Sequence, residues 1–222
     1  MNKRNYQREL DSLLEALPSS PLPRLLLHAC CAPCSSYVLE YLSRYFDITL
    51  LFYNPNIFPS EEYEKRYAEL KRLGQELPHP NPISFAVCSY DPDAFFSAVR
   101  GMESFPEGGA RCAVCYRLRL TEAAKAAKDG GFDYFTTTLS ISPMKDAEKL
   151  NAIGAELAKQ YGVAYLFSDF KKREGYKRSI TLSQEYGLYR QNYCGCIFSR
   201  AEAEKRISRQ QETINTAQAN LK

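Results

Sequence analysis

Short apolar runs alternate with amphipathic helical segments along most of this 222-residue chain. A helix between two strands favours parallel pairing, because it carries the chain back to the end of the sheet where the first strand began. The alternation therefore predicts an α/β fold of Rossmann-like type, with a mostly parallel sheet flanked by helices. The predicted strands are Leu25–His28, Ile48–Tyr53, Ile83–Cys88, Tyr134–Leu139 and Val163–Phe167.

Helical periodicity fills the intervals between these strands. Ser60 is placed to cap the helix after the second strand, because two glutamates follow it in the first turn. A Gly-Gly pair ends the long helix that begins near Cys112. The predicted helices cover residues 35–45, 60–77, 93–100, 112–128 and 146–161, and helical character returns after residue 174 and from residue 199.

The length of the chain and its 45% hydrophobic composition allow one substantial core. We therefore expect residues 1–222 to form a single domain, with an N-terminal helical extension over residues 1–20 and a C-terminal helical tail over residues 200–222. The start of the chain lacks a signal-peptide pattern, and no apolar run is long enough to cross a bilayer. These features predict a cytoplasmic protein that does not associate with membranes.

The cysteines are strongly clustered, which favours metal binding or redox chemistry over permanent disulfides in a reducing cytosol. The first cluster directly follows a predicted strand, and ligands gather beyond the carboxyl ends of parallel strands. We therefore expect a cysteine-built metal site at the C-terminal ends of the strands. The clusters are Cys30-Cys31-x-x-Cys34, Cys112-x-x-Cys115 and Cys194-Gly195-Cys196, and the eighth thiol, Cys88, stands apart as a predicted packing residue.

Two of these clusters can supply four thiolates to one centre. In a C-x-x-C spacing the two side chains converge on one side of a turn, as those of Cys112 and Cys115 would. Cys30 and Cys31 cannot both point inward from a regular strand, but a loop at a strand end can aim both at one site. Four thiolates are enough for an iron–sulfur cluster or for a closed zinc site.

The remaining thiols, Cys34, Cys194 and Cys196, exceed what one structural zinc needs, because tetrahedral zinc takes four ligands. The Cys-Gly-Cys pair could close a strained, readily reduced disulfide or ligate an additional metal, and the residues alone leave both open. His28 precedes the first cluster and could act as a ligand or proton donor. A histidine at a strand end is more commonly only hydrogen-bonded.

Positive charge concentrates at the C-terminal end of the chain. Residues 171–222 hold 11 Lys or Arg against 5 Asp or Glu, although the net charge of the whole chain is only +3. A local excess of this kind suits a polyanion such as RNA, and a solvated helix surface would explain it equally well. Within this region Lys171–Arg173 and Lys177–Arg178 are the predicted phosphate contacts.

Short motifs of distinctive residues follow one another between Leu25 and Ser199. They are Cys30–Ser35, Tyr53–Ile57, Glu61-x-Tyr63-x-x-Arg66, Arg111–Leu120, Thr136–Pro143 and Tyr189–Cys196. Each motif is weakly specific by itself, whereas the ordered set is specific. The set resembles the QueH-type epoxyqueuosine reductases, and the resemblance covers nearly all of this range.

The resemblance implies an enzyme that removes the epoxide oxygen of epoxyqueuosine in tRNA and so forms queuosine at the wobble position of the anticodon. Making an alkene from an epoxide consumes two electrons and two protons and releases water. The partners implied are therefore tRNA and an external low-potential electron donor. The resemblance also implies a [4Fe-4S] cluster, carried over onto Cys30, Cys31, Cys112 and Cys115.

The family further implies a second reactive centre at Cys194 and Cys196, which would be a redox pair or hold one additional iron. Cys34 is placed where it could join that centre. A dithiol or a second iron would offer another redox equivalent, or a Lewis acid for the epoxide oxygen. Tyr116, Tyr193 and Lys145 are the candidate proton donors.

Substrate contacts are predicted from polar residues near strand ends and near the last cysteine pair. Tyr189–Tyr193 interleaves aromatic and cationic residues, as expected where an anticodon base stacks, but tyrosines packed inward at a helix end would look the same. The predicted substrate-binding residues are Asn54, Asn56, Arg111, Thr137, Ser142, Lys145, Arg190 and Gln191.

Two other functions remain as alternatives. The predicted sheet is similar to that of the adenine-nucleotide-binding HUP class, which includes ATP-dependent tRNA sulfur transferases. Such an enzyme would be expected to carry a Ser-Gly-Gly-x-Asp-Ser phosphate loop where this chain has Cys30–Cys34. The second alternative is a zinc-stabilised RNA-binding module without chemistry.

Overall fold

A five-stranded parallel sheet organises the part of the chain that the structure describes. The structure is a computed structural model that describes residues 4–219, with side chains for residues 4–213. The strands lie in the order β3-β2-β1-β4-β5, and every pairing between them is parallel, which confirms the predicted α/β fold. The strands are β1 (Arg24–His28), β2 (Asp47–Leu51), β3 (Ser84–Ala86), β4 (Tyr134–Thr137) and β5 (Ala164–Tyr165).

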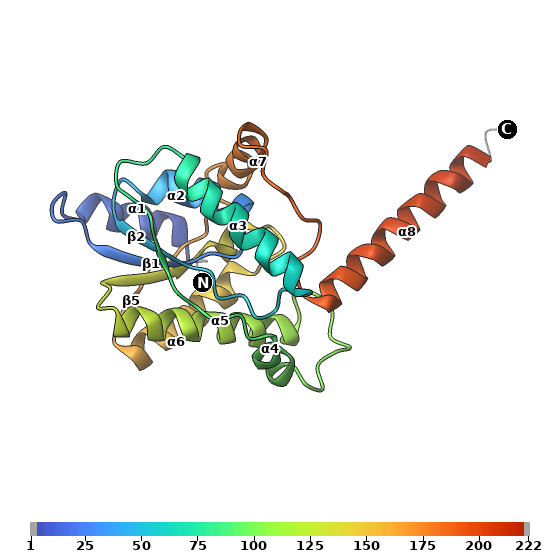
Figure 1. Cartoon of the computed structure of the whole chain (residues 1–222), viewed down its shortest axis with the longest axis horizontal. Coiled ribbons are helices and arrows are strands. Elements are labelled where there is room, and N and C mark those ends of the chain that lie inside the picture. The colour runs from blue at the N-terminus through green and yellow to red at the C-terminus, as the bar shows by residue number, and fades with distance from the viewer. Residues whose placement is uncertain (1–3, 220–222) are drawn as a thin grey trace.

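Helices cover both faces of this sheet (Figure 1). Helices α2, α3 and α7 pack together on one face, while α5 and α6 pack against each other on the opposite face. The helices are α1 (Tyr6–Ala16), α2 (Ala32–Leu42), α3 (Ser60–Glu76), α4 (Pro92–Ala98), α5 (Ala110–Asp129), the 3-10 helix η1 (Thr138–Ile141), α6 (Ala147–Tyr161), α7 (Gly175–Glu185) and α8 (Ile197–Ala219).

The central strand β1 explains why this sheet is stable. Leu25, Leu26 and Leu27 are all fully buried, because β1 has a neighbouring strand on each side and helices over both faces. Leu25 and Leu27 pack in the core under α2, and Leu26 packs in the core under α5. Alternate residues of β1 therefore pack against the helices on opposite faces of the sheet. This packing fixes the position of the residues that directly follow β1.

Several predicted boundaries are wrong by a few residues, and a polar cap explains one of them. β4 ends at Thr137 instead of Leu139, because the Thr137 hydroxyl accepts a hydrogen bond from the Leu139 amide at 3.1 Å and starts η1. Ser60 does not cap α3; it is the first helical residue, and Pro59 occupies the cap position. The second strand stops at Leu51, and α2 starts at Ala32, three residues before the predicted start.

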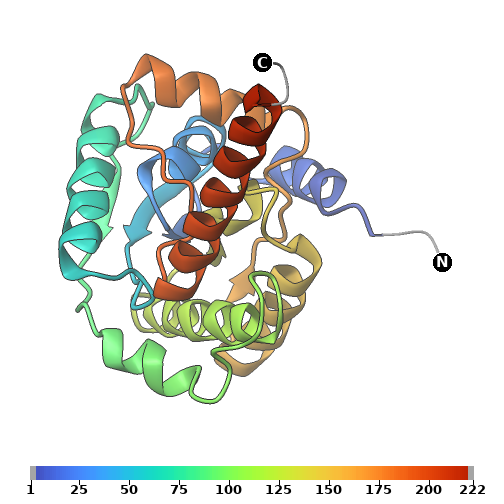
Figure 2. The same ribbon diagram turned by 90° about the vertical axis from the view of Figure 1, so that its right-hand side faces the viewer.

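The two terminal segments are helical where they are described. Helix α1 lies within the predicted extension 1–20, and α8 projects away from the sheet and its helices (Figures 1 and 2). Residues 1–3 and 220–222, which belong to the predicted terminal segments, lie outside the described residues. Within residues 4–219 no helix combines the length and the apolar character that a membrane span requires.

Candidate thiol and metal site

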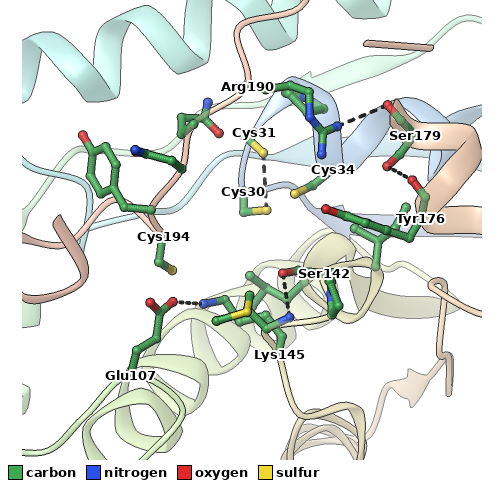
Figure 3. Close-up of a pocket in the computed structure, with 18 of the residues that line it drawn as sticks. Cys30, Cys31, Cys34, Glu107, Ser142, Lys145, Tyr176, Ser179, Arg190 and Cys194 are labelled. Carbon is green, nitrogen blue, oxygen red and sulfur yellow. Dashed lines mark hydrogen bonds and ion pairs between the residues drawn. The ribbon is translucent and has the colours of Figure 1, made fainter. Parts of the chain in front are cut away.

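An open pocket of about 350 Å³ lies at the carboxyl ends of β1 and β4 (Figure 3). The loop between β1 and α2 brings three cysteines to it, and the segment after β4 brings Ser142 and Lys145. Helix α7 contributes Tyr176, and the segment before α8 contributes Arg190 and Gln191. Elements far apart in sequence thus meet at the edge of the sheet where ligands bind in parallel α/β folds.

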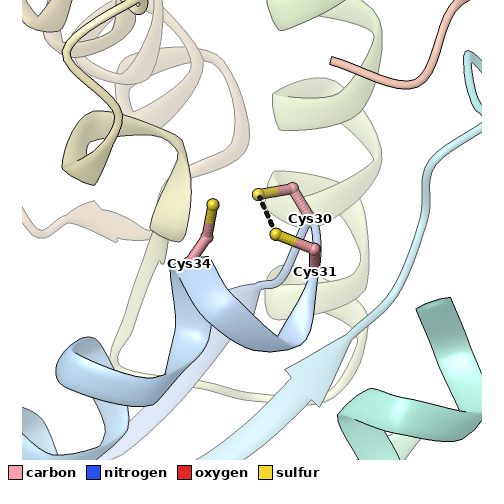
Figure 4. Close-up of side chains that lie close together, drawn as sticks. All are labelled: Cys30, Cys31 and Cys34. Carbon is pink, nitrogen blue, oxygen red and sulfur yellow. Dashed lines mark hydrogen bonds between the residues drawn. The ribbon is translucent and has the colours of Figure 1, made fainter. Parts of the chain in front are cut away.

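Cys30, Cys31 and Cys34 form a compact group of thiols, called the loop triad below (Figure 4). Their sulfur atoms all lie within 4.8 Å of one another, and those of Cys30 and Cys31 are 3.9 Å apart. Cys31 is the extended residue before α2, and Cys34 lies in the first turn of that helix. The start of α2 therefore brings the Cys31 and Cys34 sulfur atoms close together. Three thiolates with this spacing are suited to holding a metal ion or one face of a cluster.

The loop triad favours one thiolate in particular. Hydrogen bonds from the Cys31 and Cys34 thiols hold the pKa of Cys30 well below its usual range. The same contacts, together with burial, raise the pKa of Cys34. The start of α2 also lies here, and the positive end of a helix stabilises negative sulfur. Cys30 is therefore the sulfur of the triad that most readily carries a thiolate charge.

The other four clustered cysteines line a second, nearly closed cavity of about 10 Å³, and they are called the closed-cavity tetrad below. Two of them lie one turn apart at the start of α5, where the Gly108 amide donates to the Cys112 sulfur at 3.2 Å. Burial raises the pKa of Cys115 to about 12, and the neighbouring tetrad thiols act in the same direction. The tetrad is Cys112, Cys115, Cys194 and Cys196.

Gly195 gives the Cys-Gly-Cys turn its shape. Its φ of 122° lies in a region that residues with a side chain rarely adopt. A Cβ atom there would lie 3.0 Å from Ile57 and 3.1 Å from the Arg66 guanidinium. Arg66 also donates to the Cys194 carbonyl at 3.1 Å, and the Phe58 amide donates to the Gly195 carbonyl at 3.0 Å. The turn is therefore held tightly against α3 and the loop before it.

Cys194 lines both the open pocket and the closed cavity, so the loop triad and the tetrad adjoin each other. The sequence interpretation assigned Cys30 and Cys31 to a cluster with Cys112 and Cys115 and left Cys34 to a second centre. In the structure the Cys34 sulfur lies beside those of Cys30 and Cys31. The seven thiols thus share one edge of the sheet, and how they divide between ligands and redox residues stays a prediction.

A buried arginine lies among these thiols. Arg119 is 1% exposed; its Nη1 donates to the Asn54 side chain at 3.3 Å, and its Nη2 has no hydrogen-bond partner among the described residues. Burial opposes its charge, but the nearby thiolates, those of Cys115 and Cys30 among them, outweigh burial and raise its pKa. A buried guanidinium needs a compensating anion. An anionic metal–thiolate centre would provide it, so the residues present fit such a group.

A second buried cation faces the same thiols. Lys145 and Glu107 form an ion pair at 2.9 Å, and their side chains are only 6% and 11% exposed. Burial opposes the charge of Lys145, but the charge of Cys194 and then that of Tyr116 and Glu107 raise its pKa overall. Figure 3 shows this pair beside Cys194 at the floor of the pocket. Lys145 therefore remains a cation with exchangeable protons next to the thiols.

The eight predicted substrate-binding residues fall into three sets. Asn54 and Thr137 are occupied structurally: the Asn54 amide donates to the Ala29 carbonyl at 2.8 Å, and the Thr137 hydroxyl bonds His28 at 2.8 Å. Neither lines the open pocket. Asn56 and Arg111 line the closed cavity instead. The four that line the open pocket are Ser142, Lys145, Arg190 and Gln191.

His28 is fully buried and hydrogen-bonded to Thr137 and to the Tyr53 carbonyl at 3.1 Å. Burial, and then the charge of Arg119, lowers its pKa to about 4, so it is neutral at physiological pH. The structure therefore agrees with the simple reading of a strand-end histidine that only bonds its neighbours. The predicted packing residue Cys88 lies apart from both thiol groups, near Tyr63.

Sequence reasoning did not single out Arg66, Arg119 or Glu107 as site residues. Both arginines lie on apolar stripes of their helices: Arg66 is 2% exposed on α3, and Arg119 is 1% exposed on α5. A cation at helical spacing between buried apolar residues is the signal that could have found them, because such a residue must have a partner inside the fold.

The fold and the site together define a class of protein: a parallel α/β protein with clustered cysteines, in an arrangement able to bind a metal, at the carboxyl edge of its sheet. A family model described as "Epoxyqueuosine reductase QueH" matches residues 25–202. The chain therefore belongs to the epoxyqueuosine reductase QueH family, a family of oxidoreductases.

Individual relatives agree with this membership. The chain is 42% identical over 200 residues to the epoxyqueuosine reductase QueH of Streptococcus pyogenes, a match that spans 89% of this chain and 78% of the relative. It is 39% identical over 202 residues to the protein of the same name from Staphylococcus epidermidis, with 89% and 85% covered. The Staphylococcus aureus protein of that name is 40% identical over 202 residues, with 89% and 84% covered.

Proposed function

We propose that this chain reduces the epoxide of epoxyqueuosine in tRNA to the alkene of queuosine, with the help of a [4Fe-4S] cluster. The observation that carries the proposal is the open pocket, which places three thiols of one loop and Cys194 around a space of about 350 Å³. Membership of the family indicates the reaction, and the clustered thiols are suited to holding the redox centre that the reaction needs. Both C–O bonds of the epoxide break, two electrons enter, and the oxygen leaves with two protons as water.

A [4Fe-4S] cluster at this edge would deliver electrons one at a time, and Cys30, Cys31, Cys112 and Cys115 are the proposed residues that hold it. Cys194 and Cys196 are proposed to form the second centre, as a redox pair or with one additional iron. Cys34, which lines the same pocket as Cys194, is the third residue proposed for it. The buried Arg119 supports an anionic group here, because its guanidinium has an unpartnered nitrogen. An external low-potential donor would have to supply both electrons.

The pocket side chains are suited to a nucleobase and to proton transfer. Tyr176 and Tyr193 offer aromatic surfaces for stacking, and Arg190, held by the Ser183 hydroxyl at 3.0 Å, offers donors. Lys145 holds exchangeable protons beside Cys194 and is the proposed donor to the departing oxygen. Tyr116, another candidate donor, lines the closed cavity, and its hydroxyl has no hydrogen-bond partner within the described part of the chain.

A groove of about 900 Å³ next to the pocket is the proposed path of the RNA backbone. It shares Lys145 with the pocket and contains Lys171–Arg173. Lys171 pairs with Asp169, and Arg173 pairs with Asp11, whereas Lys172 is exposed. The other predicted phosphate cluster is held in local ion pairs: Lys177 contacts Glu174, and Arg178 contacts Glu40 and Glu185.

The decisive experiment is turnover. Protein purified and reconstituted without oxygen should convert epoxyqueuosine-containing tRNA to queuosine with a low-potential reductant, as detected by analysis of the digested nucleosides. A fully loaded protein that forms no queuosine would contradict the proposal. Stoichiometric zinc without iron or sulfide would favour an RNA-binding module, and a requirement for ATP would favour a sulfur transferase.

The backbone path has its own test in Lys172→Glu, with Lys128→Glu as the matched control. Lys128 is also exposed, but it lies at the end of α5, on the far edge of the sheet. Lys172→Glu should weaken tRNA binding, with the slope of log Kd against log salt shallower by about 1. Equal slopes for the two variants would place the backbone elsewhere.

A further inference from the structure

Helix α8 begins at the thiol site and then leaves the body of the protein. Its first residue, Ile197, directly follows Cys196, and its first turns are anchored: Ser199 is 1% exposed and Ala203 is 4% exposed. Arg111 fixes the same segment, because it pairs with Glu202 at 3.2 Å. The direction in which α8 projects is therefore set by contacts next to the tetrad (Figures 1 and 2).

Beyond these anchors α8 projects away from the sheet and the helices that cover it (Figure 1). Every side chain described from residue 204 to residue 213 is exposed. A helix with polar residues on every side buries no apolar surface when it stands alone in water. Most helices in proteins owe their stability to tertiary packing, of which this part of α8 has little among the described residues. The 23-residue length corresponds to a reach of about 35 Å. A partner outside the chain accounts for this length better than the fold of the chain itself.

The charge of the exposed part points to a polyanion. Two acidic residues at the start of this segment are paired with arginines: Glu202 with Arg111, and Glu204 with Arg200 at 3.0 Å. Glu212 is the further acidic residue described between residues 204 and 213, against three cations. The remaining cations of this segment are exposed and lie within about one helical turn, so one face of α8 is basic. They are Lys205, Arg206 and Arg209.

The basic face is continuous with the open pocket. Arg206 lines the pocket, and its guanidinium reaches the Asn192 carbonyl at 3.5 Å. A nucleotide whose base occupies the pocket must leave its own backbone and the adjoining strands outside the mouth, where α8 starts. A second copy of this chain is a poorer occupant, because Ile207 is the exposed large hydrophobic residue found on this segment, and stable protein interfaces need an apolar core.

We propose that α8 is a phosphate-binding arm, whose Lys205, Arg206 and Arg209 contact the backbone of the RNA that carries the base in the open pocket. The inference rests on the proposed function for the identity of that base. It adds a second cationic surface next to the pocket, separate from the Lys171–Arg173 groove, which shares Lys145 with the pocket. RNA that contacts both surfaces would be held at two places while one base is inserted.

The test is the triple variant Lys205→Glu, Arg206→Glu, Arg209→Glu. The matched control reverses Lys125, Lys128 and Lys159, which are exposed and lie at the ends of α5 and α6, on the far edge of the sheet. The α8 variant should bind unmodified full-length tRNA on the order of ten- to a hundredfold more weakly, with a salt slope shallower by about 2 to 3, and the control should stay near wild type.

The binding assay uses unmodified tRNA, so it reports on α8 even if the protein forms no queuosine. If turnover is present, the double variant Lys205→Glu, Arg209→Glu, which spares the pocket residue Arg206, should raise KM for tRNA with kcat and iron content unchanged. A thermal melt should confirm that each variant is folded. An equal loss of tRNA affinity in the α8 variant and in the control would contradict the proposal that α8 binds phosphate. So would unchanged tRNA affinity combined with the conversion of a wild-type dimer to a monomer, which would make α8 an interface between copies.

Discussion

The loop triad and the closed-cavity tetrad are held in opposite ways. The triad comes from five consecutive residues at the end of one strand, and it faces a pocket of about 350 Å³. The tetrad joins two segments about eighty residues apart, around a cavity of about 10 Å³. The triad faces a space large enough for a substrate, whereas the cavity between the tetrad thiols is too small for one, and only Cys194 of the tetrad lines the open pocket.

The cationic side chains near the two groups of thiols also differ in whether they line the open pocket. Arg119 is buried beside the tetrad and donates to the Asn54 side chain. Arg66, Lys145 and Arg190 line the open pocket, and Arg66 is also paired with Glu62. We therefore expect Arg119 to balance the charge of a resident centre, and Lys145 and Arg190 to serve the bound nucleotide. Each of the following variants tests one part of that division.

The largest effects are expected from removing a thiol of the tetrad. Cys112→Ala should abolish cluster loading and all turnover, because it removes one of the four proposed cluster ligands. Cys196→Ala should lower kcat by about a thousandfold or more with the cluster largely retained, because it removes the second centre. Iron and sulfide analysis with single-turnover assays would measure both.

Cys88→Ala is the matched control, because Cys88 lies outside both thiol groups and is partly buried near Tyr63. It should keep wild-type iron content and kcat, and its stability should fall by less than about 1.5 kcal/mol. If Cys112→Ala and Cys196→Ala both simply lose the cluster, the tetrad acts as one ligand set, and the assignment of Cys30 and Cys31 to the cluster is wrong.

An intermediate effect is expected from Arg119→Met. In the loaded protein it removes the cation behind the thiols, which should cost between about 3 and 5 kcal/mol of unfolding free energy. In the unloaded protein it removes a buried charge with an unpartnered nitrogen, so stability should be unchanged or higher. Thermal melts before and after metal removal under anaerobic conditions would compare the two states.

Arg117→Met provides the control on the same helix. Arg117 is exposed and pairs with Glu156 at 2.6 Å on the surface, so its loss should cost less than about 1 kcal/mol in either state. If Arg119→Met destabilises the loaded and unloaded proteins equally, Arg119 braces α5 through Asn54 and does not balance a resident anion.

Local sequence patterns predicted the parallel sheet and the edge at which the thiols meet, because alternating strands and helices constrain both. They did not predict the strand order, since the crossover rule fixes handedness and leaves open the side on which the next strand is added. Asn54 and Thr137 were predicted to bind substrate because polar residues at strand ends often do. The structure uses them to hold the strand ends together, which depends on neighbours distant in sequence.

The arginines were missed for a related reason. A charged residue on an amphipathic helix is ordinarily assigned to solvent, and only the tertiary packing shows that α3 and α5 turn Arg66 and Arg119 inward. The closeness of Cys34 to Cys30 and Cys31 follows from α2 starting three residues earlier than predicted, which places Cys34 in its first turn. A small shift of one boundary thus changes which thiols form a group.

The smallest predicted effect concerns the turn that joins the two regions. Gly195→Ala should cost about 1 to 3 kcal/mol from its backbone conformation, and its Cβ would press on Ile57 and Arg66. Gly187→Ala is the control, because Gly187 also has a positive φ but no atom near its Cβ position. If position 195 sets the spacing of Cys194 and Cys196, only Gly195→Ala should also lower turnover at equal iron content. Equal turnover in both variants would mean that the triad and the tetrad work without a fixed connection at Cys194.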